Sequence, residues 1–309
     1  MAQKVILVAD PGIDTAFAIA LAVHDPELDV LALAATAGNV SAEQATRNAH
    51  TLVEQFDPPK WPRLGEALPV EYGVDGTDLH GPGGLGGVSF QCAELHHPHP
   101  SDKLIVDEVH QHPSEVTLVA LGPLTAIARA MDREPQLPRL VRRLVVVGGS
   151  WREPGNASAV AEFHFYCDPL AARQVLRCGA PITLIPLDTM RKALFSPTEL
   201  SELPCGDSRT CQLLRKIVLF GVTATAQRYG IEGFHLKDVL GVAAVALPKA
   251  LTTKPMSVDV ETRGELTRGM SVFDLRPHRE SARPNVELAV DVDMKAVRQY
   301  MADTFRRLS

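Results

Sequence analysis

Hydrophobic positions in this chain form short continuous runs, separated by longer segments in which alanine and polar residues mix. None of the runs shows the strict alternation of a strand with one wet face, so each is typical of a strand buried on both faces. The segment at 16–23 is rich in alanine, as helices are. The runs lie at residues 5–8, 30–35, 116–121, 144–147 and 182–187. Strands separated by helices predict an α/β fold of Rossmann type, with a mostly parallel β-sheet flanked by helices.

Polar or glycine-rich residues follow each of these runs. After the first run they include two carboxylates, whose role is either functional or structural. Asp10 comes directly after it, and Asp14 stands where the next helix begins. In open α/β sheets, ligands bind outside the carboxyl ends of the strands. The alternative is structural, with Asp14 capping the helix and Asp10 bonding the amides of a turn. The segment itself leaves both readings open.

The composition of the chain limits the classes of protein to which it can belong. A chain of 309 residues with 45% hydrophobic content can bury a large core, and we found no linker or repeat that divides it, so we expect one domain over 1–309. A net charge of -6 without a basic block argues against nucleic acid as a partner. No run approaches the roughly 20 apolar residues of a membrane span. We therefore expect a cytoplasmic protein that binds neither nucleic acid nor membrane.

Two stretches rich in glycine or proline predict little regular structure, and the cysteines predict neither a disulfide framework nor a metal site. The stretch at 79–87, LHGPGGLGG, is too rich in glycine for a helix or strand, and predicts a flexible loop or one that contacts a ligand. The stretch at 91–100, rich in His and Pro, predicts a surface connection. Five cysteines at unrelated spacings indicate buried thiols rather than a disulfide framework or a metal site.

Several motifs, taken in order, resemble the inosine-uridine preferring nucleoside hydrolase family. They are DPGID at 10–14, AGNV at 37–40, the HG and GLGG elements at 80–87, LGPLT at 121–125, GG at 148–149, GN at 155–156, AEF at 161–163, DP at 168–169, LDT at 187–189 and the segment around Asp238. No single motif is decisive, but their order and spacing together are specific. The resemblance covers most of the chain and favours a functional role for Asp10 and Asp14.

This resemblance implies the nucleoside hydrolase fold and hydrolysis of the N-glycosidic bond of a ribonucleoside to base and ribose. It also implies a calcium ion, which is bound by oxygen ligands and holds the ribose hydroxyls and the attacking water. Asp10 would bind calcium and act as the base, with Asp238, the Leu121 carbonyl and position 15 as further ligands. The residues that would line the substrate site are Asp14, Asn39, His80, Asn156, Glu162, His164 and Asp238.

The chain departs from the family pattern at positions that matter for this chemistry. The family's calcium-binding carboxylate after DPGID is Thr15 here, so we expect calcium to bind weakly or not at all. The family histidine before the calcium aspartate is Lys237, a candidate catalytic residue at the leaving base, and the family asparagine after AEF is His164. Gly83 replaces an aspartate. Taken alone, Lys237 fits an ordinary surface lysine and His164 a hydrogen-bonded core histidine.

Three interpretations of function follow. The first is a nucleoside hydrolase that keeps the ribose pocket and alters the metal site. The second is a weak or inactive homologue that binds a ribosyl ligand. The third is a hydrolase of a modified or phosphorylated nucleoside, with Lys237 and His164 holding an anionic group. In each case the partner is a small nucleoside-like molecule, and the family resemblance implies a homodimer or homotetramer.

Overall fold

The protein is built on a nine-stranded β-sheet, seen in a computed structural model that describes residues 2–70, 75–90, 99–204, 206–276 and 283–308. The strands follow the order β10-β13-β7-β6-β5-β1-β2-β3-β4. All neighbours are parallel except β10 and β13. The bounds are β1 Gln3–Ala9, β2 Leu28–Ala35, β3 Arg63–Glu66, β4 His99–Pro100, β5 Thr117–Leu121, β6 Arg143–Val147, β7 Ile182–Ile185, β10 Leu251–Met256 and β13 Val286–Val292.

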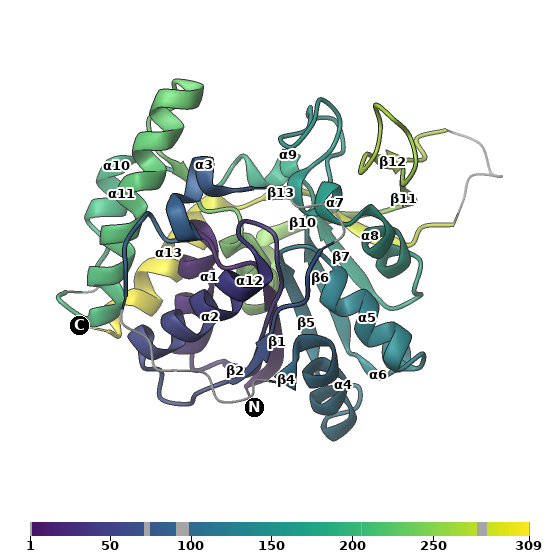
Figure 1. The fold of residues 1–309 in the computed structure, drawn as a ribbon, viewed down its shortest axis with the longest axis horizontal. Helices are drawn as coiled ribbons and strands as arrows, with labels where there is room; N and C mark the ends of the chain where they lie inside the picture. Colours follow the sequence, from purple (N-terminus) through teal and green to yellow (C-terminus); the bar gives the residue numbers. More distant parts are fainter. Residues whose placement is uncertain (1, 71–74, 91–98, 205, 277–282, 309) are drawn as a thin grey trace.

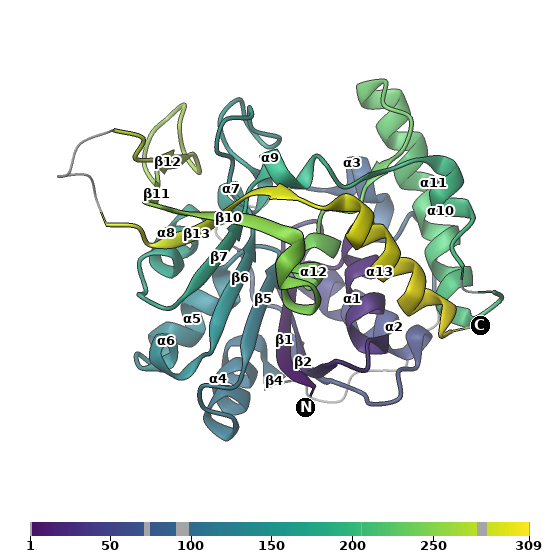
Figure 2. The same cartoon turned by 180° about the vertical axis from the view of Figure 1, so that it is seen from behind.

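Helices cover both faces of this sheet (Figure 1). One hydrophobic core joins the sheet to α1 Ile13–His24, α2 Ala42–Phe56, α11 Arg209–Tyr229, α12 Val239–Ala246 and α13 Met294–Arg306. The other joins it to α4 Ser101–Gln111, α5 Thr125–Arg133, α6 Leu137–Leu140 and α8 Pro169–Leu176. The view from behind shows α13 and α12 on the first side and α4 to α6 on the second (Figure 2). The predicted α/β fold with a mostly parallel sheet is confirmed.

The five predicted strands are β1, β2, β5, β6 and β7. They form the centre of the sheet, where helices on both faces exclude water, and this explains why their sequences are continuously apolar. The sequence did not indicate β3, β4, β10 and β13, which lie toward the edges and mix polar with apolar residues. Edge strands need less hydrophobic sequence because one side is open to solvent.

Smaller elements complete the chain. They are α3 Thr77–His80, η1 Pro82–Gly84, α7 Phe163–Cys167, α9 Leu187–Met190, β8 Leu194–Phe195, α10 Pro197–Ser201, β9 Phe234–His235, η2 Pro248–Ala250, β11 Val258–Val260 and β12 Ser271–Phe273. Strands β8 and β9 pair with each other, as do β11 and β12. None of the described helices is long and apolar enough to cross a membrane.

Two expectations need correction. The glycine-rich stretch at 79–87 is not free of regular structure, since it contains the end of α3 and the turn η1; glycines at 81, 83, 84, 86 and 87 all have positive φ, which keeps these turns tight. Cys211 is disulfide-bonded and not a free thiol. The irregular spacing of the cysteines argues against a framework of several disulfides, but it does not exclude one bond. Cys167 is a buried thiol as expected, and Cys178 is half-buried. Cys92, Cys205 and most of the stretch at 91–100 lie outside the described residues.

The chain order reverses at β1, which places the site. From β1 the chain proceeds through β2 to β4 on one side of the sheet, and through β5 to β7 on the other. The carboxyl ends of β1 and β5 are therefore neighbours, and Ala9 pairs with Leu121. Such a switch point leaves a crevice in which α/β proteins bind their ligands.

Candidate active site

Asp10 stands at the carboxyl end of β1 and is completely buried. Its Oδ2 accepts a hydrogen bond from the Asn39 amide at 3.1 Å, and its carbonyl accepts one from Asn39 Nδ2 at 2.9 Å. Its Oδ1 is buried without a hydrogen-bond partner among the described residues. An unpartnered buried oxygen costs about 1–3 kcal/mol, so a carboxylate held this way indicates a functional demand.

Two glycines explain how the chain packs so closely around this carboxylate. A Cβ on Gly38 would lie 2.2 Å from Asp10 Oδ2, and one on Gly122 would lie 2.8 Å from the Asp10 amide nitrogen. Both distances are far below van der Waals contact, so any side chain at either position would displace Asp10. The glycines of AGNV and LGPLT are therefore needed for close approach.

His80 holds the turn between Asp10 and α1. Its Nδ1 accepts a hydrogen bond from the Ile13 amide at 3.0 Å, which leaves the proton of the neutral ring on Nε2. Burial lowers the pKa of His80 to about 4, so its contact of 3.8 Å with Asp14 is not an ion pair at neutral pH. A Cβ on Gly12 would lie 2.8 Å from His80 Nδ1, which accounts for the glycine of DPGID.

Asp238, Asp14 and Thr15 come together beside Asp10. Thr15 Oγ1 donates a hydrogen bond of 2.6 Å to Asp238 Oδ2, joining the start of α1 to the residue before α12. Asp14 and Asp238 are at most 3% exposed. Burial raises the pKa of Asp10 and that of Asp238, and the neighbouring carboxylates, Asp14 among them, raise both further. The structure thus brings together Asp10, Asp14, Thr15 and Asp238, which the family motifs singled out, while their roles in binding and catalysis stay predictions.

His164 approaches Asp10 from the other side of the switch point. Its Nδ1 lies 2.7 Å from the Val147 carbonyl oxygen, which can only accept, so Nδ1 carries a proton. In the neutral ring Nε2 is then an acceptor, and it lies 3.9 Å from Asp10 Oδ1. The two acceptors are close enough to share one water molecule.

Glu162 caps a helix, and its role in substrate binding stays a prediction. Its Oε2 accepts the amides of Gly149 at 3.0 Å and His164 at 3.0 Å, and a longer bond from Phe165, so it caps the amino terminus of α7. It is absent from the lining of the cavities described below. Its place in AEF predicted a location near the site, but a capping side chain and a ligand-binding one share the same sequence pattern.

Lys237 is half-buried and lies among the carboxylates. Burial alone would lower the pKa of Lys237, but Asp14, Asp238, Glu162 and Asp10 together hold it above its usual value. Lys237 therefore stays an ammonium ion at neutral pH. The interpretation as an ordinary surface lysine is wrong.

Two adjoining cavities open beside this cluster. The first, here called the carboxylate cavity, has a volume of about 210 Å³ and is lined by predicted residues. They are Asp14, Asn39, His80, Asn156, His164, Lys237 and Asp238. The second, the apolar cavity, is larger, about 350 Å³, and is lined by Leu79, Leu187, Tyr229, Ile231 and Phe234 among others. Lys237, His80 and Asn156 border both cavities.

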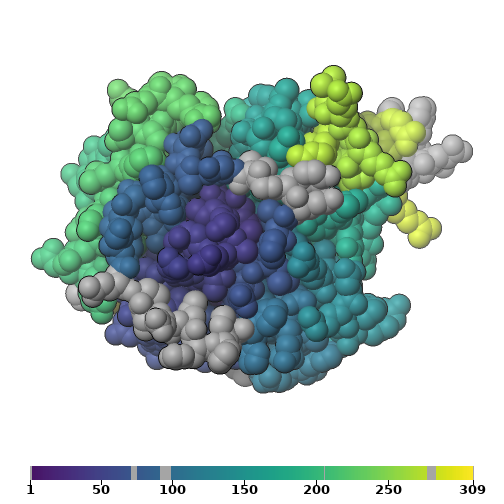
Figure 3. Space-filling view, viewed as in Figure 1, coloured from purple at the N-terminus to yellow at the C-terminus, as the bar shows by residue number. Residues whose placement is uncertain are grey.

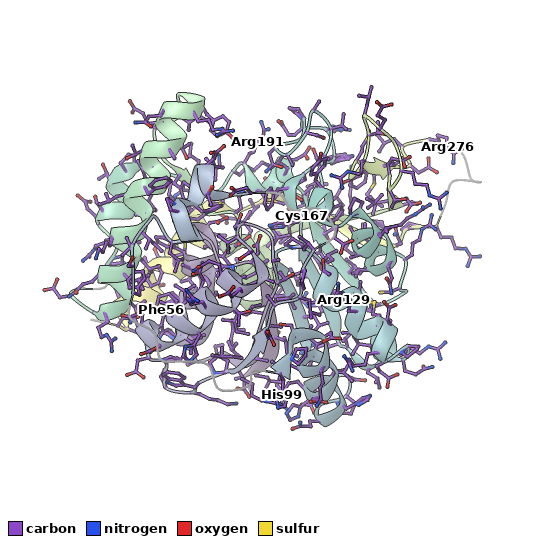
Figure 4. All side chains as sticks on the ribbon, viewed as in Figure 1. Phe56, His99, Arg129, Cys167, Arg191 and Arg276 are labelled. Atoms are coloured by element: carbon purple, nitrogen blue, oxygen red, sulfur yellow. The ribbon has the colours of Figure 1, made fainter. Side chains whose placement is uncertain are left out.

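The cavities lie between α3, α11 and the loop at 155–157. In the space-filling view the surface is hollowed between the green residues of α11 and the teal loops (Figure 3). Arg191, which lines the apolar cavity, lies at the upper edge of the molecule between α3 and α9, whereas Cys167 lies further inside (Figure 4). Asp10, Thr15 and the Leu121 residue are absent from both linings.

Sequence reasoning missed several residues that line the two cavities, of which Asp78 lies in α3 and Thr225, Arg228 and Tyr229 lie in α11. These are Asp75, Asp78, Arg228 and Tyr229 in the carboxylate cavity, and Thr225, Arg191 and His235 in the apolar cavity. Burial and the charge of Lys237 lower the pKa of His235 to about 4. His235 stands two residues before Lys237, in the segment around Asp238, whereas Thr225, Arg228 and Tyr229 of α11 lie in none of the motifs.

The residues present fit a calcium ion poorly. One oxygen of Asp10 is bonded to the Asn39 amide, and one oxygen of Asp238 is bonded to Thr15. No group of three or more His, Cys, Asp or Glu side chains among the described residues is arranged to hold a metal. Calcium takes six to eight oxygen ligands, with carboxylates supplying most of the charge. The predicted set of Asp10, Thr15, Leu121 and Asp238 contains only two carboxylates.

Comparison with known proteins identifies the family. The profile described as inosine-uridine preferring nucleoside hydrolase matches residues 5–299. Proteins named non-specific ribonucleoside hydrolase RihC, from Escherichia coli and Shigella boydii, are 36% identical, with 98% of each chain covered. A plant nucleoside hydrolase, PpNRh1, has a TM-score of 0.90 at 29% identity, and the purine-preferring ribonucleoside hydrolase of Gardnerella vaginalis has 0.89 at 26%, each with 99% of both chains covered. This chain belongs to the inosine-uridine preferring nucleoside hydrolase family.

Proposed function

We propose that this enzyme hydrolyses the N-glycosidic bond of a ribonucleoside, with Asp10 as the base that activates the attacking water. The observation that carries the proposal is the unpartnered Oδ1 of Asp10, 3.9 Å from His164 Nε2 beside the carboxylate cavity. A water held between these two acceptors is oriented to attack and can lose its proton to Asp10. The family and the names of the relatives support the reaction class.

The carboxylate cavity suits the ribose and the charge that develops on it. Cleavage of an N-glycosidic bond passes through a transition state in which the sugar resembles an oxocarbenium cation. Asp14 and Asp238 line the cavity, and Asp10 lies behind them, so negative charge surrounds the developing cation. Fixed charges in a site that excludes water stabilise a transition state strongly. Asp14, Asn156 and Asp238 are positioned to accept or donate hydrogen bonds to sugar hydroxyls.

The apolar cavity suits the base that leaves. Its aromatic and aliphatic walls match the flat faces of a nucleobase, and it adjoins the carboxylate cavity at Lys237. An ammonium at that border donates a hydrogen bond to the departing base and offsets its negative charge. Because its pKa is raised, Lys237 stabilises the leaving group as a charged donor and is poorly suited to delivering a proton.

A phosphorylated substrate is less well supported. Asp14, Asp75, Asp78 and Asp238 line the carboxylate cavity, against the cations Lys237 and Arg228. Arg228 is already paired with Asp78. A phosphate would meet an excess of negative charge, so we expect nucleosides to bind better than their 5′-monophosphates.

Release of free base from a panel of purine and pyrimidine ribonucleosides tests the proposed function. The native enzyme should cleave at least one of them, and Asp10→Asn should not. A native protein that binds a ribonucleoside in calorimetry without cleaving any of the panel would support the ribosyl-binding homologue instead. Complete burial of Asp10 is the observation that keeps this second function open.

A further inference from the structure

Four carboxylates share the site with almost no access to water. Asp10, Asp14, Glu162 and Asp238 are each at most 3% exposed. Burial of an ionised carboxylate costs several kcal/mol unless a cation compensates it. Among the described residues, the short ion-pair contacts of these four involve only His80 and His164, at 3.8–4.0 Å. Burial keeps His80 neutral, so His80 supplies no positive charge to the cluster.

Lys237 is placed to supply this charge. It lines the carboxylate cavity together with Asp14 and Asp238, and it also borders the apolar cavity. Its backbone is held on each side, since the Leu236 amide bonds the Ala193 carbonyl at 3.0 Å and the Leu240 amide bonds the Lys237 carbonyl at 3.1 Å. A lysine whose backbone is held in this way keeps its positive charge at the cavity that Asp14 and Asp238 line.

Thr15 also makes the site less suited to a metal ion. Its hydroxyl donates to Asp238 Oδ2 and so satisfies an oxygen that a metal ion would otherwise bind. As a neutral side chain, it also adds no negative charge to a cluster that already holds four carboxylates. Thr15 and Lys237 together reduce both the ligands and the negative charge that calcium requires.

We propose that the Lys237 ammonium is the resident cation of this site and replaces a divalent metal ion, so that the enzyme works without calcium. The catalytic part of this proposal rests on the proposed function; the cation part does not. The single charge of Lys237 offsets part of the negative charge of the carboxylates in the free enzyme, and at the border of the cavities it meets the leaving base during the reaction.

Calcium binding in a pair of variants tests the cation part. Thr15→Asp adds a carboxylate, and Thr15→Asp combined with Lys237→Met also removes the ammonium, so that the site becomes more negative by two charges. Isothermal calorimetry should detect no calcium site in the native protein stripped with EGTA. The double variant should bind one calcium ion, at least about tenfold more tightly than Thr15→Asp alone, because Lys237 repels the ion. Thermal unfolding should follow, with calcium raising the Tm of the double variant more than that of Thr15→Asp.

Lys237→Arg in the Thr15→Asp background is the matched control, because it keeps the positive charge. It should bind calcium as weakly as Thr15→Asp alone. Calcium that binds the native protein as tightly as the double variant would overturn the proposal, and so would equal affinities of the Met and Arg variants. The Met and Arg variants share the Thr15→Asp background, so their difference isolates the positive charge at position 237, and circular dichroism checks that each is folded.

Base release separates this proposal from the proposed function. We expect turnover of the native enzyme to be unchanged by excess EGTA and by added calcium. Loss of turnover in EGTA with recovery in calcium would overturn metal independence while supporting hydrolysis. If no ribonucleoside is cleaved under any condition, the proposed function fails, and the calorimetric comparison still decides the role of Lys237.

Discussion

The two sides of the site are built differently. On the side of β1, Asp10 is fixed by the Asn39 amide, by glycines that leave no room to move, and by a turn that His80 holds. On the side of α11, Tyr229 is 52% exposed, and the apolar cavity is lined by side chains from separate segments. The difference teaches that the groups around Asp10, where we propose that the attacking water binds, are preorganised. The walls of the apolar cavity, where we propose that the nucleobase binds, are held less tightly and can adapt.

Substitution of Asp10 tests the rigid side most severely. Asp10→Asn keeps the shape of the side chain and removes the base, so turnover should fall at least about a hundredfold. The fold should remain, because the Asn oxygen still accepts from the Asn39 amide. Steady-state release of free base and circular dichroism check both expectations.

Asp102→Asn is the matched control, because Asp102 also has a buried Oδ1 without a partner among the described residues but lies away from the cavities. Its other oxygen is paired with Arg133 at 2.8 Å, so this variant should lose stability and keep turnover. Near-normal turnover by Asp10→Asn would remove Asp10 from the mechanism.

Gly38→Ala should damage catalysis through position alone. The new methyl group would lie 2.2 Å from Asp10 Oδ2 and push the carboxylate aside, at a cost of roughly tenfold to a hundredfold in kcat. Gly65→Ala is the control, since its methyl group would lie 2.7 Å from Ser101 Oγ, outside the site. Both variants should lose about 1–3 kcal/mol of stability, but only Gly38→Ala should lose activity. Equal kcat values for the two variants would show that the close packing around Asp10 is merely structural.

Thr15→Val removes the hydroxyl that bonds Asp238 and keeps the size of the side chain. The bond lowers the pKa of Asp238, so its loss should raise that pKa further and reduce the free energy of unfolding by about 1.5 kcal/mol. Thr125→Val is matched, because Thr125 donates a bond of 2.7 Å to Asp168 in another buried pair. Denaturant unfolding should give similar losses for both, while the pH dependence of turnover should change for Thr15→Val alone. If Thr15→Val leaves the pH profile of turnover unchanged, Thr15 has no role in catalysis.

The pH dependence of the free energy of unfolding should report the cost of burying the ionised Asp10 carboxylate. Its pKa in the folded state is raised above that of the unfolded chain, so the folded state binds the proton more tightly. Stability is therefore lost as pH rises from the unfolded pKa, about 3.9, through the raised folded value. Asp10→Asn should abolish this loss and therefore stabilise the protein more at pH 7 than at pH 4. The same gain at both values would contradict the shift.

The sequence by itself determined the central strands, the position of Asp10 and Asp14 at the end of the first one, and the departures at Thr15 and Lys237. These follow from local rules, because a strand buried on both faces must be apolar and a polar residue at its end must face a loop. Glu162 shows the limit of this reasoning. Its place in AEF located it near the site, but only the backbone amides around it decided that it caps α7.

Tertiary structure alone decided which distant residues meet at the site. The edge strands, and the contribution of Arg228 and Tyr229 from α11, depend on how helices pack against the finished sheet, and no spacing in the chain encodes that arrangement. The surroundings of Lys237 were decided in the same way. The carboxylates of Asp14, Asp238, Glu162 and Asp10 raise its pKa, and electrostatic interactions depend on distance in space and not on distance along the chain.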